Sequence, residues 1–202
     1  AVQFLHPKRL CFAFLYDFFM TRSVFPVKFN ADITRHAAIL SSELGDVHGQ
    51  QVLELGTGSG AAADFLPPDN DYTGSDISTG LLKQAHRRFQ AAGFYQAQFY
   101  VASGNDLPFA AASFDLSLCL LSLNFIGDHL SVFEGVHAML LPGGTFRVSV
   151  PVPERTPQAS TIRGNLLSQI RLQKLCQDAG FRFEPLEAEN GALLYFRAVK
   201  DK

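Results

Sequence analysis

The sequence is poor in cysteine and has no strong excess of charge of either sign. Its 202 residues include only three cysteines, Cys11, Cys119 and Cys176, and no two of them stand at a metal-binding or redox spacing. We therefore expect a reduced, cytoplasmic setting and no bound metal. The formal net charge of −2 gives no general attraction to phosphates, so we expect no nucleic-acid partner. Internal repeats and low-complexity tracts are also missing.

Tryptophan is absent, whereas phenylalanine occurs nineteen times. Many phenylalanines lie in LCFAFLYDFF, residues 10–19, which is too short to span a bilayer and is interrupted by Asp17. We expect a helix over residues 4–20 with a large apolar face. This face has three possible roles. We favour docking on its own domain, then lining a substrate pocket, and last contact with a membrane surface.

The periodicity of apolar residues predicts alternating helices and strands. Pro26 predicts a loop over residues 21–30, and Asp32 and Gly45 are suited to begin and end a helix between them. Further helices are expected over residues 59–66, 78–93, 128–141 and 167–180. Strands are expected over residues 51–55, 71–76, 97–103, 114–123, 145–152, 181–189 and 192–200, with a polar linker over 153–165.

This alternation predicts an α/β fold of the Rossmann-like, doubly wound type, with a mostly parallel seven-stranded sheet and a C-terminal antiparallel hairpin. The third and fourth strands are near-continuous apolar runs, typical of strands covered on both faces. Ligands of such sheets bind beyond the carboxyl ends of the strands. We therefore expect the glycine loop after Leu55, Asp76 and Ser103 to converge on one crevice.

The glycine loop lies in VLELGTGSG, residues 52–60. Gly56, Gly58 and Ala61 fit a dinucleotide-binding pattern, and Asp76 follows at about the distance of its ribose-binding acid. Glu54 places a negative charge beside the loop, which suits a cationic ligand and repels a diphosphate. From these residues alone, a nicotinamide cofactor remains an alternative.

Four stretches in register resemble the class I S-adenosylmethionine-dependent methyltransferases: VLELGTGSG, DYTGSDIS, ASGNDLPFAAASFDLSLCLLSLNFI and MLLPGGTFRVSV. The resemblance covers about residues 30–200. It is closest to the branch that includes the ubiquinone/menaquinone-type and type 11 enzymes. It implies S-adenosylmethionine as cofactor and S-adenosylhomocysteine as product. Residues 47–202 would form the cofactor-binding domain and residues 1–46 a helical lid over the acceptor, within one globular unit.

The resemblance also implies a set of cofactor-binding residues. Glu54 would lie near the cationic groups of the cofactor, and Asp76 would accept hydrogen bonds from the ribose hydroxyls. Ser103 stands where the family usually has an acid at the adenine edge, a departure that removes charge assistance from that contact. The complete set is Glu54, Gly56, Thr57, Gly58, Gly60, Asp76, Ile77, Ser103, Gly104, Asn105, Leu120 and Tyr16.

The acceptor side is less defined. Asn124 and Phe125 occupy the place where many relatives carry two histidines, so His129 is a replacement candidate for a base. Tyr16 is the other weak candidate for catalysis. Residues expected to line the acceptor site are Tyr16, Phe18, Phe19, Arg22, Phe25, Lys28, Phe29, Asn124, Phe125 and His129.

The resulting expectation is methyl transfer to a small, apolar or aromatic molecule by in-line displacement, in which alignment and exclusion of water matter most. No NPPY-like tetrapeptide of the amino-methylating type follows the fourth strand. A non-catalytic cofactor-binding module or partner subunit is the alternative, and an NAD(P)-dependent oxidoreductase is a further one. A monomer or a homodimer is expected.

Overall fold

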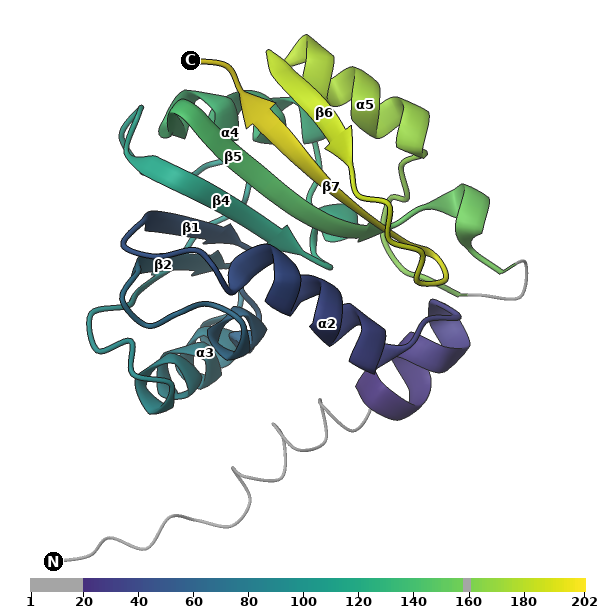
Figure 1. The fold of residues 1–202 in the computed structure, drawn as a ribbon, viewed down its shortest axis with the longest axis horizontal. Helices are drawn as coiled ribbons and strands as arrows, with labels where there is room; N and C mark the ends of the chain where they lie inside the picture. The colour runs from purple at the N-terminus through teal and green to yellow at the C-terminus, as the bar shows by residue number, and fades with distance from the viewer. Residues whose placement is uncertain (1–19, 158–160) are drawn as a thin grey trace, which may run out of the picture.

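The computed structural model describes residues 20–157 and 161–202, and it contains one seven-stranded sheet in the order β3-β2-β1-β4-β5-β7-β6 (Figure 1). The strands are β1 (Gln51–Leu55), β2 (Asp71–Asp76), β3 (Gln98–Val101), β4 (Phe114–Leu120), β5 (Leu140–Pro151), β6 (Phe181–Pro185) and β7 (Leu193–Lys200). The helices are α2 (Ile33–Leu44), α3 (Thr79–Ala91), α4 (His129–Met139) and α5 (Gln169–Asp178).

The first five strands run parallel, and β7 pairs antiparallel with both β5 and β6. The predicted fold class is therefore confirmed. Strand order reverses at β1, which lies between β2 and β4. The loops that follow β1, β2 and β4 thus leave the same edge of the sheet, beside the switch point.

Alternation of side chains along β1 divides the core into two layers. Leu53 and Leu55 belong to a cluster with residues of α4 and α5 on one face. Val52 belongs to a second cluster, with Leu44 at the end of α2 and Phe89 of α3, on the other face. Figure 1 shows α2 on the near side of the sheet.

A third cluster joins the two ends of the described chain. Phe25 and Phe29 pack against Ala192, Leu193 and Tyr195 around the start of β7. A backbone bond of 2.7 Å from the Ala192 N–H to the Phe29 carbonyl reinforces this contact. The segment before α2 is therefore fixed to the C-terminal hairpin.

Two local predictions before and after β1 were wrong. Residues Met20–Lys28 form a π-helical segment instead of a loop, with Pro26 inside it. In such a wide turn each N–H bonds the carbonyl five residues back, as the Phe29 N–H does with Val24 at 3.0 Å. After the glycine loop, the predicted helix over 59–66 is reduced to one 3₁₀ turn, Ala61–Asp64.

Two strand predictions also need correction. β3 lies at the edge of the sheet, and its Val101 side chain is 61% exposed, so this strand is not covered on both faces. The helix predicted over residues 128–141 ends at Met139, and β5 begins directly afterwards at Leu140. The LPGG segment, residues 141–144, therefore belongs to the strand.

Several sequence predictions fall on residues outside the described part of the chain. They are the helix over residues 4–20 and the roles of Cys11, Tyr16, Phe18 and Phe19. Of the described cysteines, Cys119 and Cys176 are buried and free. In residues 20–157 and 161–202, no helix combines the length and apolarity needed to cross a membrane.

Candidate functional site

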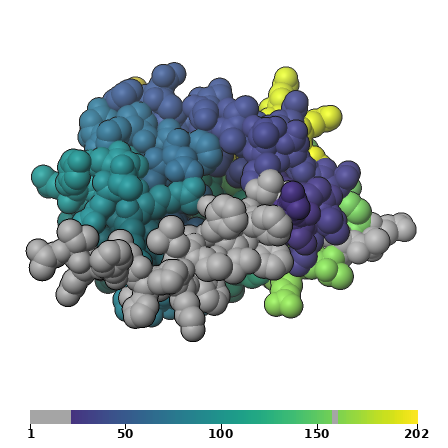
Figure 2. All heavy atoms as spheres, turned by 90° about the horizontal axis from the view of Figure 1, so that it is seen from below, coloured from purple at the N-terminus to yellow at the C-terminus, as the bar shows by residue number. Residues whose placement is uncertain are grey.

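A cavity of about 580 Å³ opens at the carboxyl ends of β1, β2 and β4. Its wall includes the glycine loop and Asp76 on one side and the segment before α2, with α2 itself, on the other. Figure 2 shows the hollow between the purple residues of α2 and the blue residues around α3. The site thus joins a polar end to an apolar end.

The glycine loop forms the polar end, and its backbone conformation depends on glycine. Gly56, Gly58 and Gly60 all have positive φ, between 54° and 85°. A Cβ on Gly56 would lie 2.6 Å from Ser122, and a Cβ on Gly60 would lie 2.8 Å from the Ala85 backbone. A Cβ on Gly58 would meet nothing closer than 4.0 Å. Gly56 and Gly60 therefore allow close packing, whereas Gly58 leaves open space at the cavity wall.

Asp76 ends β2 and connects two loops at the cavity. Its Oδ2 accepts the Gly58 N–H at 3.0 Å, and its Oδ1 accepts the Ser78 N–H at 2.8 Å. The carboxylate is therefore oriented by backbone donors while it contributes to the cavity wall. The start of α3 does not depend on it, because Ser78 is the residue that caps this helix.

Glu54 lies buried in β1, 2% exposed, where the cavity meets the core. Thr57 Oγ1 donates to Glu54 Oε2 at 2.8 Å, and the Tyr72 hydroxyl donates to the same oxygen. No described residue bonds Oε1. The Tyr72 ring reaches Glu54 because Gly74 has no side chain: a Cβ there would lie 3.0 Å from Tyr72 Cε1.

Burial raises the pKa of Glu54 to about 7, although the hydrogen bonds from Tyr72 and Thr57 lower it, and the charge of Asp76 raises it further. The folded protein therefore holds this proton more tightly than the unfolded chain, whose carboxyl has the ordinary pKa of 4.5. The stabilising contribution of the protonated group is complete below pH 4.5. It is lost as pH rises through 4.5 to about 7.

We expect Glu54→Gln to remove this pH dependence. Between pH 4.5 and 7, the free energy of unfolding of the natural chain should fall by about 3 kcal/mol relative to that of the variant. Urea denaturation of both proteins across this range measures the difference, in which contributions from other carboxyl groups cancel. Parallel stability curves for the two proteins would show that Glu54 titrates normally.

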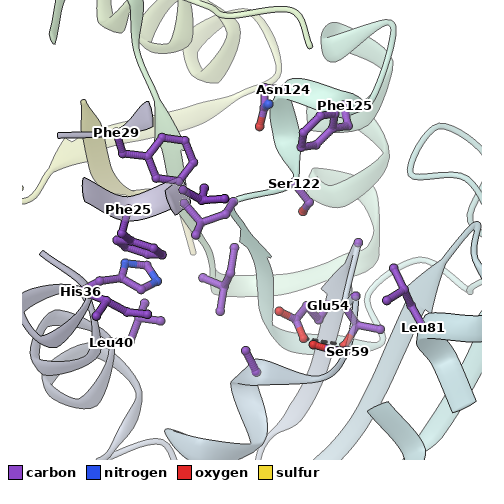
Figure 3. Close-up of a pocket in the computed structure, with 18 of the residues that line it drawn as sticks. Phe25, Phe29, His36, Leu40, Glu54, Ser59, Leu81, Ser122, Asn124 and Phe125 are labelled. Carbon is purple, nitrogen blue, oxygen red and sulfur yellow. Dashed lines mark hydrogen bonds between the residues drawn. The ribbon is translucent and has the colours of Figure 1, made fainter. Parts of the chain in front are cut away.

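The apolar end of the cavity is built from four segments. Phe25 and Phe29 come from the segment before α2, Leu40 from α2, Leu121 from the turn after β4 and Ile162 from the linker. Figure 3 shows Phe25, Phe29 and Leu40 on one wall, with Phe125 across from them. This chamber is well suited to an apolar molecule.

Leu121 lines the cavity in a strained backbone conformation. Its φ is 57°, a left-handed value that is rare for a residue other than glycine. Its N–H is held by the Ser149 carbonyl of β5 at 2.8 Å. The Leu121 side chain packs against the cluster that contains Phe25 and Phe29.

The linker between β5 and α5 contacts the chamber through Asn124. Asn124 Nδ2 donates to the Arg163 carbonyl at 2.7 Å, and the Asn124 carbonyl accepts the Asn165 N–H at 2.7 Å. Gly164, with φ of 97°, lies so close that a Cβ would be 2.2 Å from the Asn124 carbonyl oxygen. These contacts bring Ile162 and Arg163 to the cavity wall.

The structure brings together about half of the residues expected from the sequence. Glu54, Gly56, Thr57, Gly58, Asp76 and Leu120 line the cavity, as do Phe25, Lys28, Phe29, Asn124 and Phe125 on the acceptor side. Gly60 lies behind the loop against α3.

Other expected residues do not line this cavity. Ile77 is 77% exposed. In the loop after β3, Ser103 is exposed, Gly104 packs against Ile126, and Asn105 donates to the carbonyls at positions 127 and 128. Arg22 is exposed outside the wall.

His129, predicted as a replacement base, also lies away from the cavity. It is buried at the start of α4, near Leu123 and Arg171, and burial lowers its pKa. It is therefore not among the residues that line the cavity.

Sequence reasoning missed several residues that line the cavity, among them His36 and Ser122. It also missed Tyr72, which does not line the cavity but donates to Glu54. His36 could have been found, because it lies three residues after Ile33 and four before Leu40, on the inward face of the predicted helix. Ser122 Oγ donates to the Leu55 carbonyl at 3.0 Å and packs against Gly56. That contact depends on tertiary structure and has no local signal.

Comparison with known proteins identifies a related family. A family model described as a methyltransferase domain matches residues 52–144. A trans-aconitate 2-methyltransferase from Paracidovorax citrulli is 31% identical over 139 residues, which cover 67% of this chain and 52% of that protein. The ubiquinone/menaquinone biosynthesis C-methyltransferase UbiE from Desulfotalea psychrophila is 34% identical over 106 residues, covering 51% of this chain and 42% of that protein.

The chain spans about half the length of these relatives. Among solved structures, an S-adenosylmethionine-dependent methyltransferase from Mesorhizobium loti matches with a TM-score of 0.66 at 21% identity. That match covers 82% of this chain and 98% of the other. It shows a shared fold that extends well beyond residues 52–144.

Proposed function

The chain belongs to the class I S-adenosylmethionine-dependent methyltransferases, and from this we propose that it transfers a methyl group from S-adenosylmethionine to a small, apolar or aromatic molecule. The observation that carries the proposal is a single cavity with the glycine loop and Asp76 at one end and the phenylalanine-lined chamber at the other.

The residues of the polar end fit this cofactor. The open space beside Gly58 allows a ligand to approach the backbone of the loop. Asp76 has carboxylate oxygens suited to ribose hydroxyls, and Glu54 has an oxygen without a described partner near the expected ammonium group. Thr57, Gly56 and Leu120 complete the proposed site. When bound, S-adenosylmethionine would supply an activated methyl group.

The size and surroundings of the chamber support a small acceptor. Its side chains are largely apolar. The whole cavity, polar end and chamber together, has a volume of about 580 Å³, which is in the range of small-molecule sites. The trans-aconitate and ubiquinone/menaquinone methyltransferases named above are, by their names, enzymes of small molecules. We propose that residues 20–46 and residues 161–165 of the linker close the chamber over such an acceptor.

In this proposal, the protein acts mainly by alignment and exclusion of water. Phe25, Phe29 and Leu121 hold the acceptor against the polar end, and their apolar surfaces keep water from the reacting groups. No general base is assigned, because an acceptor that is already nucleophilic requires none.

Titration calorimetry with S-adenosylhomocysteine tests the cofactor assignment. We expect binding in the natural chain and a loss of about tenfold to a hundredfold in Asp76→Ala, because hydrogen bonds to a charged group are removed. Asp71→Ala is the matched control, since Asp71 is exposed at the opposite end of the same strand. Its affinity should equal that of the natural chain.

NADH is the control ligand in the same titration. Saturable binding of NADH without binding of S-adenosylhomocysteine would contradict the proposal and favour the oxidoreductase alternative. Tight binding of S-adenosylhomocysteine without methyl transfer to any member of a broad acceptor panel would favour the non-catalytic module.

A further inference from the structure

A buried polar cluster underlies the apolar chamber. His36 Nδ1 lies 2.8 Å from the Tyr195 hydroxyl, and Asn190 Nδ2 donates to that hydroxyl at 3.1 Å. His36 lies on α2 and is 7% exposed, whereas Tyr195 lies on β7 and is 2% exposed.

The direction of each hydrogen bond in the cluster follows from the backbone of Asp32. The Asp32 N–H can only donate, and it bonds Asn190 Oδ1 at 2.8 Å. The Asp32 carbonyl can only accept, and it bonds Asn190 Nδ2 at 3.0 Å. The amide of Asn190 is therefore fixed with Nδ2 facing Tyr195, so the Tyr195 oxygen is an acceptor in that contact.

The hydroxyl proton of Tyr195 then has one described acceptor, His36 Nδ1. A histidine that accepts at Nδ1 and is neutral must carry its proton on Nε2. Burial lowers the pKa of His36 to about 4, so the ring is neutral at pH 7. The cluster thus fixes His36 as the Nε2–H tautomer.

His36 forms part of the cavity wall. Figure 3 shows its ring beside that of Phe25, above Leu40, and the two aromatic centroids are 5.0 Å apart. No described residue hydrogen-bonds to Nε2. The ring therefore retains one unused donor at a wall that is otherwise largely apolar.

We propose that His36 Nε2–H is the specificity-determining donor of the acceptor chamber, and that it selects apolar or aromatic molecules bearing an oxygen that accepts a hydrogen bond, such as a carbonyl or carboxylate. This inference rests on the proposed function only in naming that molecule as the methyl acceptor. Tyr195 and Asn190 are positioning residues, which act through the tautomer of His36.

The tautomer is measured by ¹⁵N nuclear magnetic resonance of the histidine rings at pH 7, without any ligand. We expect a protonated Nε2 and an unprotonated Nδ1 for His36. Tyr195→Phe keeps the buried ring but removes the hydroxyl donor, so the preference for one tautomer should disappear. A protonated Nδ1 in the natural chain would overturn the proposal.

Acetophenone and α-methylstyrene test the selectivity, because they differ only by a carbonyl oxygen in place of a methylene group. We expect the natural chain to bind acetophenone about fivefold to tenfold more tightly than α-methylstyrene. This is the gain in affinity that one additional hydrogen bond provides. His36→Leu should abolish the preference. His36→Gln, whose amide N–H can replace Nε2–H, should retain it.

Each titration is made with and without S-adenosylhomocysteine. If the preference for acetophenone is found but S-adenosylhomocysteine does not bind, the proposed function fails and the donor role of His36 stands. If S-adenosylhomocysteine binds but the natural chain shows no preference, or does not bind acetophenone, the inference about His36 fails alone.

Discussion

Gly58→Val should reduce the affinity for S-adenosylhomocysteine by about a hundredfold or more while leaving the protein folded. A Cβ at Gly58 meets no atom closer than 4.0 Å, so the protein itself has room for the side chain. That room is part of the cavity. The valine methyl groups would therefore occupy the space that the cofactor is proposed to use.

Backbone strain is the competing explanation for such a loss, because Gly58 has a φ of 54°. Gly49→Val is the matched control. Gly49 has a φ of 61°, is exposed in the turn before β1, and has no atom within 4 Å of a built Cβ. It carries a similar strain cost of about 1–3 kcal/mol outside the cavity. Equal loss of affinity in both variants would show that strain, and not occupancy, weakens binding.

Gly60→Ala should have the opposite outcome, with a large loss of stability even though only one methyl group is added. The new Cβ would lie 2.8 Å from Ala85 Cα and 3.2 Å from Phe89 Cδ2. Both belong to α3, and neither residue is exposed. Because a backbone atom cannot turn aside as a side chain can, α3 must move away from the glycine loop.

We expect Gly60→Ala to lower the free energy of unfolding by about 2–6 kcal/mol, from overpacking together with the strain of a φ of 85°. Urea denaturation followed by circular dichroism measures this change. Together, Gly58→Val and Gly60→Ala distinguish a glycine that leaves space at the cavity wall from one that allows α3 to pack closely. Normal stability of Gly60→Ala would mean that α3 is not in close contact with the loop.

The sequence predicted those features best that depend only on residues close to one another along the chain. Asp32 and Ser78 begin helices at the predicted positions, because each side chain accepts a backbone N–H of the first turn. The glycine loop was predicted because its spacing follows directly from close backbone approach. The sheet and its antiparallel hairpin followed from the alternation of strands with helices.

The remaining features depend on contacts between distant segments. An apolar run such as that of β3 does not reveal whether it lies at the centre or the edge of the sheet. Tyr72 reaches Glu54 only because β1 and β2 pair in register and Gly74 leaves space between them. His36 becomes part of the site through Tyr195, which is 159 residues away in sequence.

The packing of Phe25 and Phe29 against Leu193 and Tyr195 has a consequence for how the site forms and how it can change. The glycine loop packs against α3 and Ser122, whereas the chamber forms only when Phe25 and Phe29 meet the start of β7. Contacts between segments so far apart in sequence require the closure of a long loop, which slows folding. Substitutions in the meeting segments can therefore alter which molecule is accepted without altering the loop, so the two halves of the site can evolve separately.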